Sequence, residues 1–94
     1  MKKIGILGSR ELSCKILSWI VKQNNVNIVG VVVPPFKGWW DDNLEKTSKS
    51  HKINTYDTIE KLLEQKPDIL FSINYWKTIS KEHINEVKEG IINI

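Results

Sequence analysis

Two polar residues follow the first apolar segment of this 94-residue chain. Ser9 and Arg10 come directly after Gly5-Ile6-Leu7-Gly8, where a strand is predicted to turn into a helix. The amide groups at the start of a helix attract anions, and a hydroxyl and a guanidinium add further donors. We predict that Ser9 and Arg10 contact a phosphate of the substrate, while a ligand-free capping turn is the alternative. The glycine spacing G-x-x-G fits neither a dinucleotide site nor a P-loop.

Adjacent aromatic residues lie in the predicted loop after the second strand. Trp39 and Trp40 offer a stacking face for a base, a sugar or a pterin. We predict that one ring faces a ligand and that the other fills the core below the loop. Asp41 and Asp42 follow at the start of a helical run, so we interpret them as caps, and no metal site is predicted.

A third cluster, Asn74-Tyr75-Trp76-Lys77, follows an apolar strand. Extended backbone at the end of a strand can pair with a flat heterocycle, whereas an ordinary connection to the next helix is the alternative. His51 and His83 fall in polar helices without a ligand-type neighbour on the same face, so we interpret both as solvated.

An alternating fold would bring these clusters together. Apolar strands are predicted at 3–7, 26–33, 53–56, 69–73 and 91–94, with helices at 11–23, 43–50, 58–66 and 81–90. This order predicts an α/β fold, a Rossmann-like parallel sheet of about five strands with flanking helices, in one domain spanning residues 1–94. The carboxyl ends of parallel strands share one edge, where ligands bind.

The first predicted helix has one apolar face, formed by Leu12, Ile16, Leu17 and Ile20. Cys14 in the same helix is interpreted as a small core residue. Because it is the single cysteine, an intrachain disulfide and a cysteine-rich zinc site are excluded. The last helix is expected to begin after Ser80, to bury Ile84 and Val87, and to end at Gly90.

The overall composition indicates a globular protein of the cytoplasm. Apolar residues make up 40% of the chain, and none of its apolar runs reaches the roughly 18–20 residues of a membrane span. The apolar stretch after Met1-Lys2-Lys3 is too short for a signal peptide. The net charge of +3 comes from scattered lysines, so we predict neither a nucleic-acid nor a membrane partner.

In order and spacing, four segments resemble the N-terminal half of a folate-dependent formyltransferase: Lys3–Ser9, Gly38–Asp41, Phe71–Tyr75 and Gly90–Ile94. The resemblance covers the whole chain and implies the N-terminal part of the formyltransferase fold. Enzymes of that family transfer the formyl group of 10-formyltetrahydrofolate to a primary amine. The resemblance therefore implies this folate as the co-substrate.

By position, Asn93 matches the asparagine that stabilises the oxyanion in that family. Asn74, Tyr75 and Trp76, with Lys77 beside them, match the segment that contacts the pterin, largely through its backbone. The family's histidine would follow directly after Ile94. The resemblance thus implies a chain truncated before the catalytic histidine, and we expect the 94 residues alone to be inactive.

Three branches of the family differ in these segments. Gly8-Ser9-Arg10-Glu11 departs from the Asn-Gly-Ser-Asn turn of glycinamide ribonucleotide formyltransferases, and the long basic insertion of methionyl-tRNA formyltransferases is missing. The tryptophan pair and Ser72-Ile73-Asn74-Tyr75 are similar to enzymes that formylate nucleotide-linked amino sugars for lipopolysaccharide O-antigen. This resemblance implies a nucleotide sugar near Ser9 and Arg10.

Two other functions and one assembly state stay open. A methionyl-tRNA formyltransferase and a non-catalytic folate- or nucleotide-binding module are the alternative functions. The fifth strand is short and apolar, and an exposed edge of this kind pairs readily with another chain, so the chain is expected to form a homodimer or to aggregate.

Overall fold

The structure, a computed structural model, describes residues 1–34 and 43–94. Strands and helices alternate along the described chain as predicted, with several boundaries shifted. In order, the elements are β1 (Lys2–Gly8), α1 (Arg10–Ile20), β2 (Val26–Val32), α2 (Asn43–Ser50), β3 (Thr55–Tyr56), α3 (Ile59–Leu63), β4 (Ile69–Ile73), α4 (Lys81–Asn85) and β5 (Ile91–Asn93).

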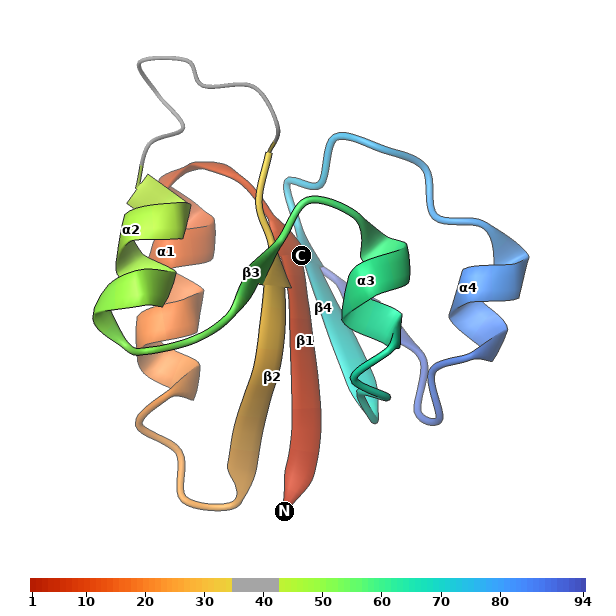
Figure 1. Cartoon of the computed structure of the whole chain (residues 1–94), viewed down its shortest axis with the longest axis horizontal. Helices are drawn as coiled ribbons and strands as arrows, with labels where there is room; N and C mark the ends of the chain where they lie inside the picture. Colours follow the sequence, from red (N-terminus) through yellow and green to blue (C-terminus); the bar gives the residue numbers. More distant parts are fainter. Residues whose placement is uncertain (35–42) are drawn as a thin grey trace.

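The strands form one sheet in the order β3-β2-β1-β4-β5, and each described pair is parallel. The predicted α/β, Rossmann-like fold class is therefore confirmed. The chain moves outward from β1 to β3 and then crosses back to β4 on the other side of β1 (Figure 1). The direction of winding changes between β1 and β4, and in sheets of this kind ligands bind beyond the carboxyl ends of the strands at that point.

Two apolar cores lie on the two faces of the sheet, and the alternation of side chains along each strand divides the residues between them. α1 and α2 cover one face, and α3 and α4 lie over the other (Figure 1). The first core consists of Ile4, Ile6, Leu17, Ile20, Val31, Leu44 and Ile73. The second core consists of Leu7, Val32, Ile59, Leu62, Leu63, Leu70 and Val87. Coverage of both faces explains the nearly continuous apolar strands.

The buried face of α1 differs from the predicted one. Ser13, Leu17 and Ile20 are buried, whereas Leu12 is 43% exposed. The start of α1 lies against the end of β4, and the small Ser13 side chain fits there, 3.0 Å from the Ile73 carbonyl oxygen. This contact rotates Leu12 away from the core. Cys14 is half-buried against the first core, which agrees in part with its interpretation as a core residue.

α4 begins as predicted and ends earlier. The Ser80 hydroxyl accepts a hydrogen bond from the His83 amide at 3.2 Å, and the helix stops at Asn85. Val87 is buried beyond the helix, but Ile84, predicted to be buried with it, is exposed. The chain then needs a left-handed residue to turn into β5, and Gly90 supplies it with a φ of 86°.

Candidate ligand site at the carboxyl edge of the sheet

Hydrogen bonds join the ends of β1 and β4 where the winding changes direction. The Ser9 amide donates to the Ile73 carbonyl at 3.2 Å, and the Ser9 hydroxyl donates to the Asn74 carbonyl at 2.7 Å. The Ser13 hydroxyl lies 2.6 Å from the Ser9 carbonyl oxygen as well as near Ile73. Gly8 permits this approach, because a Cβ there would lie 2.9 Å from the Ile73 carbonyl oxygen. The junction is therefore held by one backbone amide and two serine hydroxyls, all of which bond to backbone carbonyls.

Both chain segments leaving this junction contain a left-handed residue. Arg10 has a φ of 67° and Asn74 a φ of 54°. Lys52 and Lys66 share this conformation, but they follow α2 and α3, where helices commonly end in it. Non-glycine residues in such conformations gather at ligand sites and switch regions. The geometry thus agrees with the ligand site that the strand order indicates.

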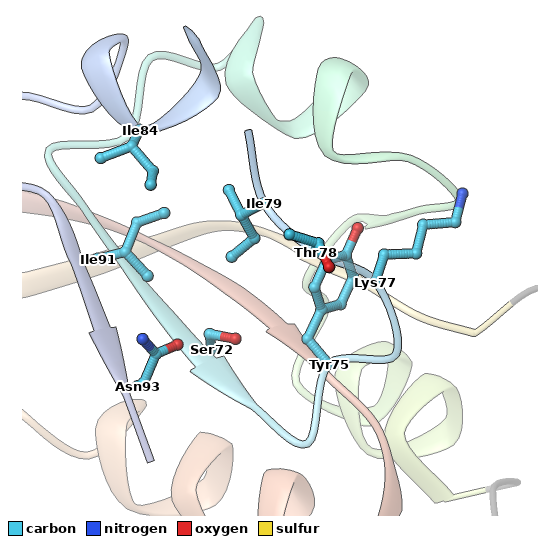
Figure 2. A pocket seen from close by; sticks show the side chains of 8 residues that line it. All are labelled: Ser72, Tyr75, Lys77, Thr78, Ile79, Ile84, Ile91 and Asn93. Carbon is cyan, nitrogen blue, oxygen red and sulfur yellow. The ribbon is translucent and has the colours of Figure 1, made fainter. Parts of the chain in front are cut away.

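A cavity of about 390 Å³ opens between the ends of β4 and β5, α4 and the loop that joins β4 to α4 (Figure 2). Its lining is formed by Ser72, Tyr75, Lys77, Thr78, Ile79, Ile84, Ile91 and Asn93. A volume of this size lies within the range of about 300–1,000 Å³ of small-molecule sites. Isoleucine side chains toward α4 make one end apolar, while Ser72 and Asn93 make the other end polar.

The register between β4 and β5 places the two polar residues side by side. Ser72 pairs with Asn93, and the Ile94 amide donates to the Ser72 carbonyl at 2.9 Å. Both side chains therefore project from the same face of the sheet into the cavity (Figure 2). An asparagine amide carries two N–H donors and one acceptor, and a serine hydroxyl adds one of each. This end of the cavity can bind the polar edge of a heterocycle or stabilise an oxyanion.

The structure places the other predicted site residues as follows. Tyr75 and Lys77 line the cavity, whereas Asn74 and Trp76 are not among the described lining residues. Trp76 packs on the second core, with its ring centroid 4.7 Å from that of Tyr75. Ser9 and Arg10 lie at the β1–β4 junction outside this cavity. The ligand contacts predicted for these residues stay predictions.

Several predicted residues cannot be placed. Trp39, Trp40, Asp41 and Asp42 lie outside the described residues. Conversely, Thr78, Ile79, Ile84 and Ile91 line the cavity without having been predicted to do so. Their sequence positions resemble those of ordinary core or loop residues, and only the arrangement of β5 and α4 around the loop identifies them.

A smaller depression of about 120 Å³ lies on the other side of the same loop. Its lining is formed by Thr58, Ile59, Glu60, Tyr75, Lys77, Thr78, Ile79, Ser80 and His83. His83 Nε2 lies 3.2 Å from Glu60 Oε2, and this contact joins α4 to α3. The interpretation of His83 as a solvated residue is therefore wrong, because a tertiary contact pairs it with a helix that precedes β4. His51, in contrast, is exposed as predicted.

Tyr75 has a perturbed phenol. Burial raises its pKa above the usual 10.0, and the negative charge of Glu60 raises it further. Both effects favour the neutral phenol, because a phenolate would lose hydration and lie near another anion. Tyr75 therefore offers the cavity a hydroxyl that both donates and accepts at neutral pH.

Neither a metal centre nor a membrane-spanning helix is present among residues 1–34 and 43–94. No group of three or more His, Cys, Asp and Glu side chains in these ranges could hold a metal ion. Within the same ranges, the helices are too short or too polar to cross a membrane.

Comparisons with known proteins identify the fold. No family model matches the chain, and no curated protein matches it. Its structure is similar to that of phosphoribosylglycinamide formyltransferase from Bacillus halodurans, with a TM-score of 0.68 and 15% sequence identity. The match covers 98% of this chain and 55% of that enzyme, so the chain spans about half the enzyme's length. The five-stranded parallel sheet with flanking helices thus matches the fold of a formyltransferase.

Proposed function

We propose that this chain binds 10-formyltetrahydrofolate and takes part in transfer of its formyl group to a primary amine. The observation that carries the proposal is the position of Asn93. It lies beside Ser72 at the polar end of a 390 Å³ cavity, at the carboxyl edge of a sheet with a formyltransferase fold. Ligands of open α/β sheets bind at this edge.

The cavity suits a flat ligand with polar edges. Ile79, Ile84 and Ile91 offer apolar surface, and the Ser72 hydroxyl and the Tyr75 phenol offer hydrogen bonds. In the proposed complex the pterin ring occupies the cavity and the formyl group lies at Asn93. The loop from Asn74 to Lys77 contributes backbone groups to the pterin.

Formyl transfer creates negative charge on the carbonyl oxygen of the formyl group, which lies next to Asn93 in the proposed complex. The amine nitrogen bonds to the formyl carbon, and the carbonyl electrons move onto oxygen. The C=O double bond then re-forms as the bond from the formyl carbon to folate N10 breaks, and the proton that the amine loses passes to N10 through an acid–base group other than Asn93. An N–H donor of Asn93 directed at the forming oxyanion would stabilise this intermediate, an effect worth about 10²–10³ in rate for a single donor. A side-chain amide transfers no protons in this reaction. The proposed role of Asn93 is therefore to bind the formyl group and to stabilise the negative charge of the oxyanion.

A nucleotide-linked amino sugar is the acceptor that the sequence supports best. This choice depends on Trp39, Trp40 and the Ser72–Tyr75 segment, which resemble the amino-sugar branch of the family. Arg10, next to Ser9 at the β1–β4 junction, would hold the diphosphate, and a tryptophan ring would stack on the base. The similar enzyme of known structure acts, by its name, on phosphoribosylglycinamide instead.

Folate binding is tested by isothermal titration calorimetry with 5-formyltetrahydrofolate, a chemically stable formyl folate. We expect saturable one-to-one binding to the wild-type chain. Ser72→Leu fills the polar end of the cavity and is expected to weaken binding at least about tenfold, as removal of a buried polar contact does. The matched control is Ser50→Leu, an exposed serine at the end of α2 on the other side of the sheet.

Two outcomes would contradict the proposal. A wild-type chain that is folded by circular dichroism but gives no heat with the folate would remove its basis. Equal affinity of the wild type and Ser72→Leu would place the ligand elsewhere. The acceptor is tested separately by saturation-transfer NMR with a uridine diphosphate amino sugar, with Arg10→Gln expected to weaken the signal and phosphoribosylglycinamide as the competing acceptor.

A further inference from the structure

A row of paired residues crosses the sheet near its carboxyl edge, on the face covered by α3 and α4. The strand register aligns Val32 of β2, Leu7 of β1, Ser72 of β4 and Asn93 of β5 in that order. Val32 and Leu7 are fully buried in the second core. Ser72 is the first polar residue of the row, and it is only 7% exposed. The row therefore changes from apolar to polar where the lining of the cavity begins.

The Ser72 hydroxyl is buried, but the fold does not use it. Within the described part of the chain, neither this hydroxyl nor the Asn93 side-chain amide has a hydrogen-bond partner. The other buried serines of the described residues each donate to a backbone carbonyl, namely Ser9, Ser13 and Ser48. Buried polar side chains in folded proteins nearly always have a partner. The partner of the Ser72 hydroxyl is therefore expected to come from the ligand that fills the cavity.

The positions of Ser72 and Asn93 allow both side chains to bind one oxygen atom. The two residues are register partners, and the Ile94 amide fixes the strands beside them by donating to the Ser72 carbonyl at 2.9 Å. Neighbouring strands lie about 4.7–4.9 Å apart. Two hydrogen bonds of about 2.7–3.0 Å can converge on one acceptor across this spacing. Figure 2 shows both side chains at the same end of the cavity.

We propose that the Ser72 hydroxyl is a second donor to the formyl oxygen, beside the Asn93 amide, and that this pair distinguishes a formylated folate from an unformylated one. The inference rests on the proposed function for the identity of the ligand. Ser72 keeps its proton in this hydrogen bond, so it takes no part in proton transfer. Hydrogen bonds to an oxyanion are stronger than those to a neutral carbonyl, so the same pair would stabilise the tetrahedral intermediate more than the bound substrate.

The test compares the affinities of 10-formyl-5,8-dideazafolate, a chemically stable formyl folate, and its unformylated parent by calorimetry. The wild type should bind the formylated compound about tenfold tighter, because two hydrogen bonds to its oxygen are added. Ser72→Ala removes one oxygen atom and should reduce this preference about fivefold, which is the effect of one hydrogen bond. Ser72→Cys keeps the shape of the side chain with a much weaker donor and should behave like Ser72→Ala.

Thr78→Val is the matched control. The Thr78 side chain lines the same cavity on the side away from Asn93 (Figure 2). Valine has nearly the shape of threonine but lacks the hydroxyl, so this variant should keep the wild-type preference for the formylated compound. A loss of preference in Thr78→Val as large as that in Ser72→Ala would assign the effect to the general polarity of the cavity and overturn the inference.

The infrared spectrum of the bound formyl group gives a second readout. Hydrogen bonds lower the stretching frequency of a carbonyl, and a ¹³C label in the formyl group separates its band from those of the protein. The band should lie at lower frequency in the wild type and Thr78→Val than in Ser72→Ala. Equal frequencies in the wild type and Ser72→Ala would overturn the inference.

The two folates also separate this inference from the proposed function. If a folded wild-type chain binds both compounds with equal affinity, the inference fails while folate binding stands. If it binds neither compound, the proposed function and the inference fail together.

Discussion

Ser9 shows how a polar side chain at a strand end can be occupied by the fold itself. It is only 5% exposed, and its hydroxyl proton is given to the Asn74 carbonyl. The hydroxyl oxygen can still accept a hydrogen bond, but it has no second proton for a phosphate. Arg10 beside it is exposed and carries the charge that a phosphate needs. At this junction we therefore expect more of any anion affinity to come from Arg10 than from Ser9.

The Tyr75 phenol provides a prediction at the scale of one residue. Its pKa lies above the usual 10.0 in the folded chain because of burial and the Glu60 charge, whereas in the unfolded chain it has the ordinary value. The unfolded state thus loses its proton first, and the contribution to stability falls as pH rises above about 10. Glu60→Gln should lower the Tyr75 pKa, measured by ultraviolet absorbance of tyrosinate.

Tyr56→Phe serves as the background for this titration, since Tyr56 is the other tyrosine. An unchanged tyrosinate curve after the Glu60 substitution would mean that the Glu60 carboxylate does not act on the Tyr75 phenol.

Positions in the cavity lining were predictable only where the sequence places polar side chains after a strand or at a residue matched by resemblance. Tyr75, Lys77 and Asn93 were predicted as ligand residues on that basis or by resemblance, and all three line the cavity. The His83–Glu60 contact was missed because its partners lie on different helices, and no periodicity relates them. Ile84 was predicted to be a core residue because the residues of a helix that line a cavity have the same sequence spacing as residues that face a core.

At the scale of elements, the strands were predicted more accurately than the helix ends. β4 matches its predicted range, since an apolar run between a proline and polar residues has clear limits. α1 was predicted to reach Gln23, but Lys22 and Gln23 bond to carbonyls three residues earlier. Such tight turns continue the apolar spacing of an α-helix without its hydrogen bonds, so periodicity cannot distinguish them. Glu86 and Val87 extend α4 in the same way.

The β1–β4 junction gives a prediction at this scale. Gly8→Ala places a methyl group against the Ile73 carbonyl oxygen, a backbone atom that moves only with β4. We expect a loss of about 1–3 kcal/mol in the free energy of unfolding, as for other overpacked sites, measured by urea denaturation. Gly90→Ala is the comparison, because its Cβ would meet nothing within 4 Å and only the left-handed φ is strained.

An unchanged free energy of unfolding in Gly8→Ala would show that the ends of β1 and β4 can move apart without loss of stability. The backbone hydrogen bond from Ser9 to Ile73 would then contribute little to the arrangement of the site.

At the scale of the whole molecule, the two faces of β5 differ. Ile91 and Asn93 face the cavity, whereas Ile92 and Ile94 project to the opposite face and are 43% and 55% exposed. α1 and α2 cover the central part of that face and leave these isoleucines in contact with water. Exposed apolar side chains on an edge strand favour pairing with another strand.

Self-association through β5 is therefore expected for the 94-residue chain. Size-exclusion chromatography with light scattering should show a dimer at micromolar concentrations, and Ile92→Lys should shift it to the monomer. Thr55→Lys, on the opposite edge strand β3, is the control and should leave the dimer intact. A wild-type chain that stays monomeric at every concentration would contradict this expectation.

The short pairing of β4 with β5 also determines how often β5 opens. Among the described residues, β5 is held on one side only, and the bond from the Ile94 amide to Ser72 is its last link. Edge strands open transiently far more often than central strands. Each opening of β5 moves the Asn93 side chain away from the cavity. A ligand that contacts Asn93 therefore binds only the state of the chain in which β5 is paired with β4. Deuterium uptake at Ile94 should therefore slow on binding, while uptake in β1 stays as it was.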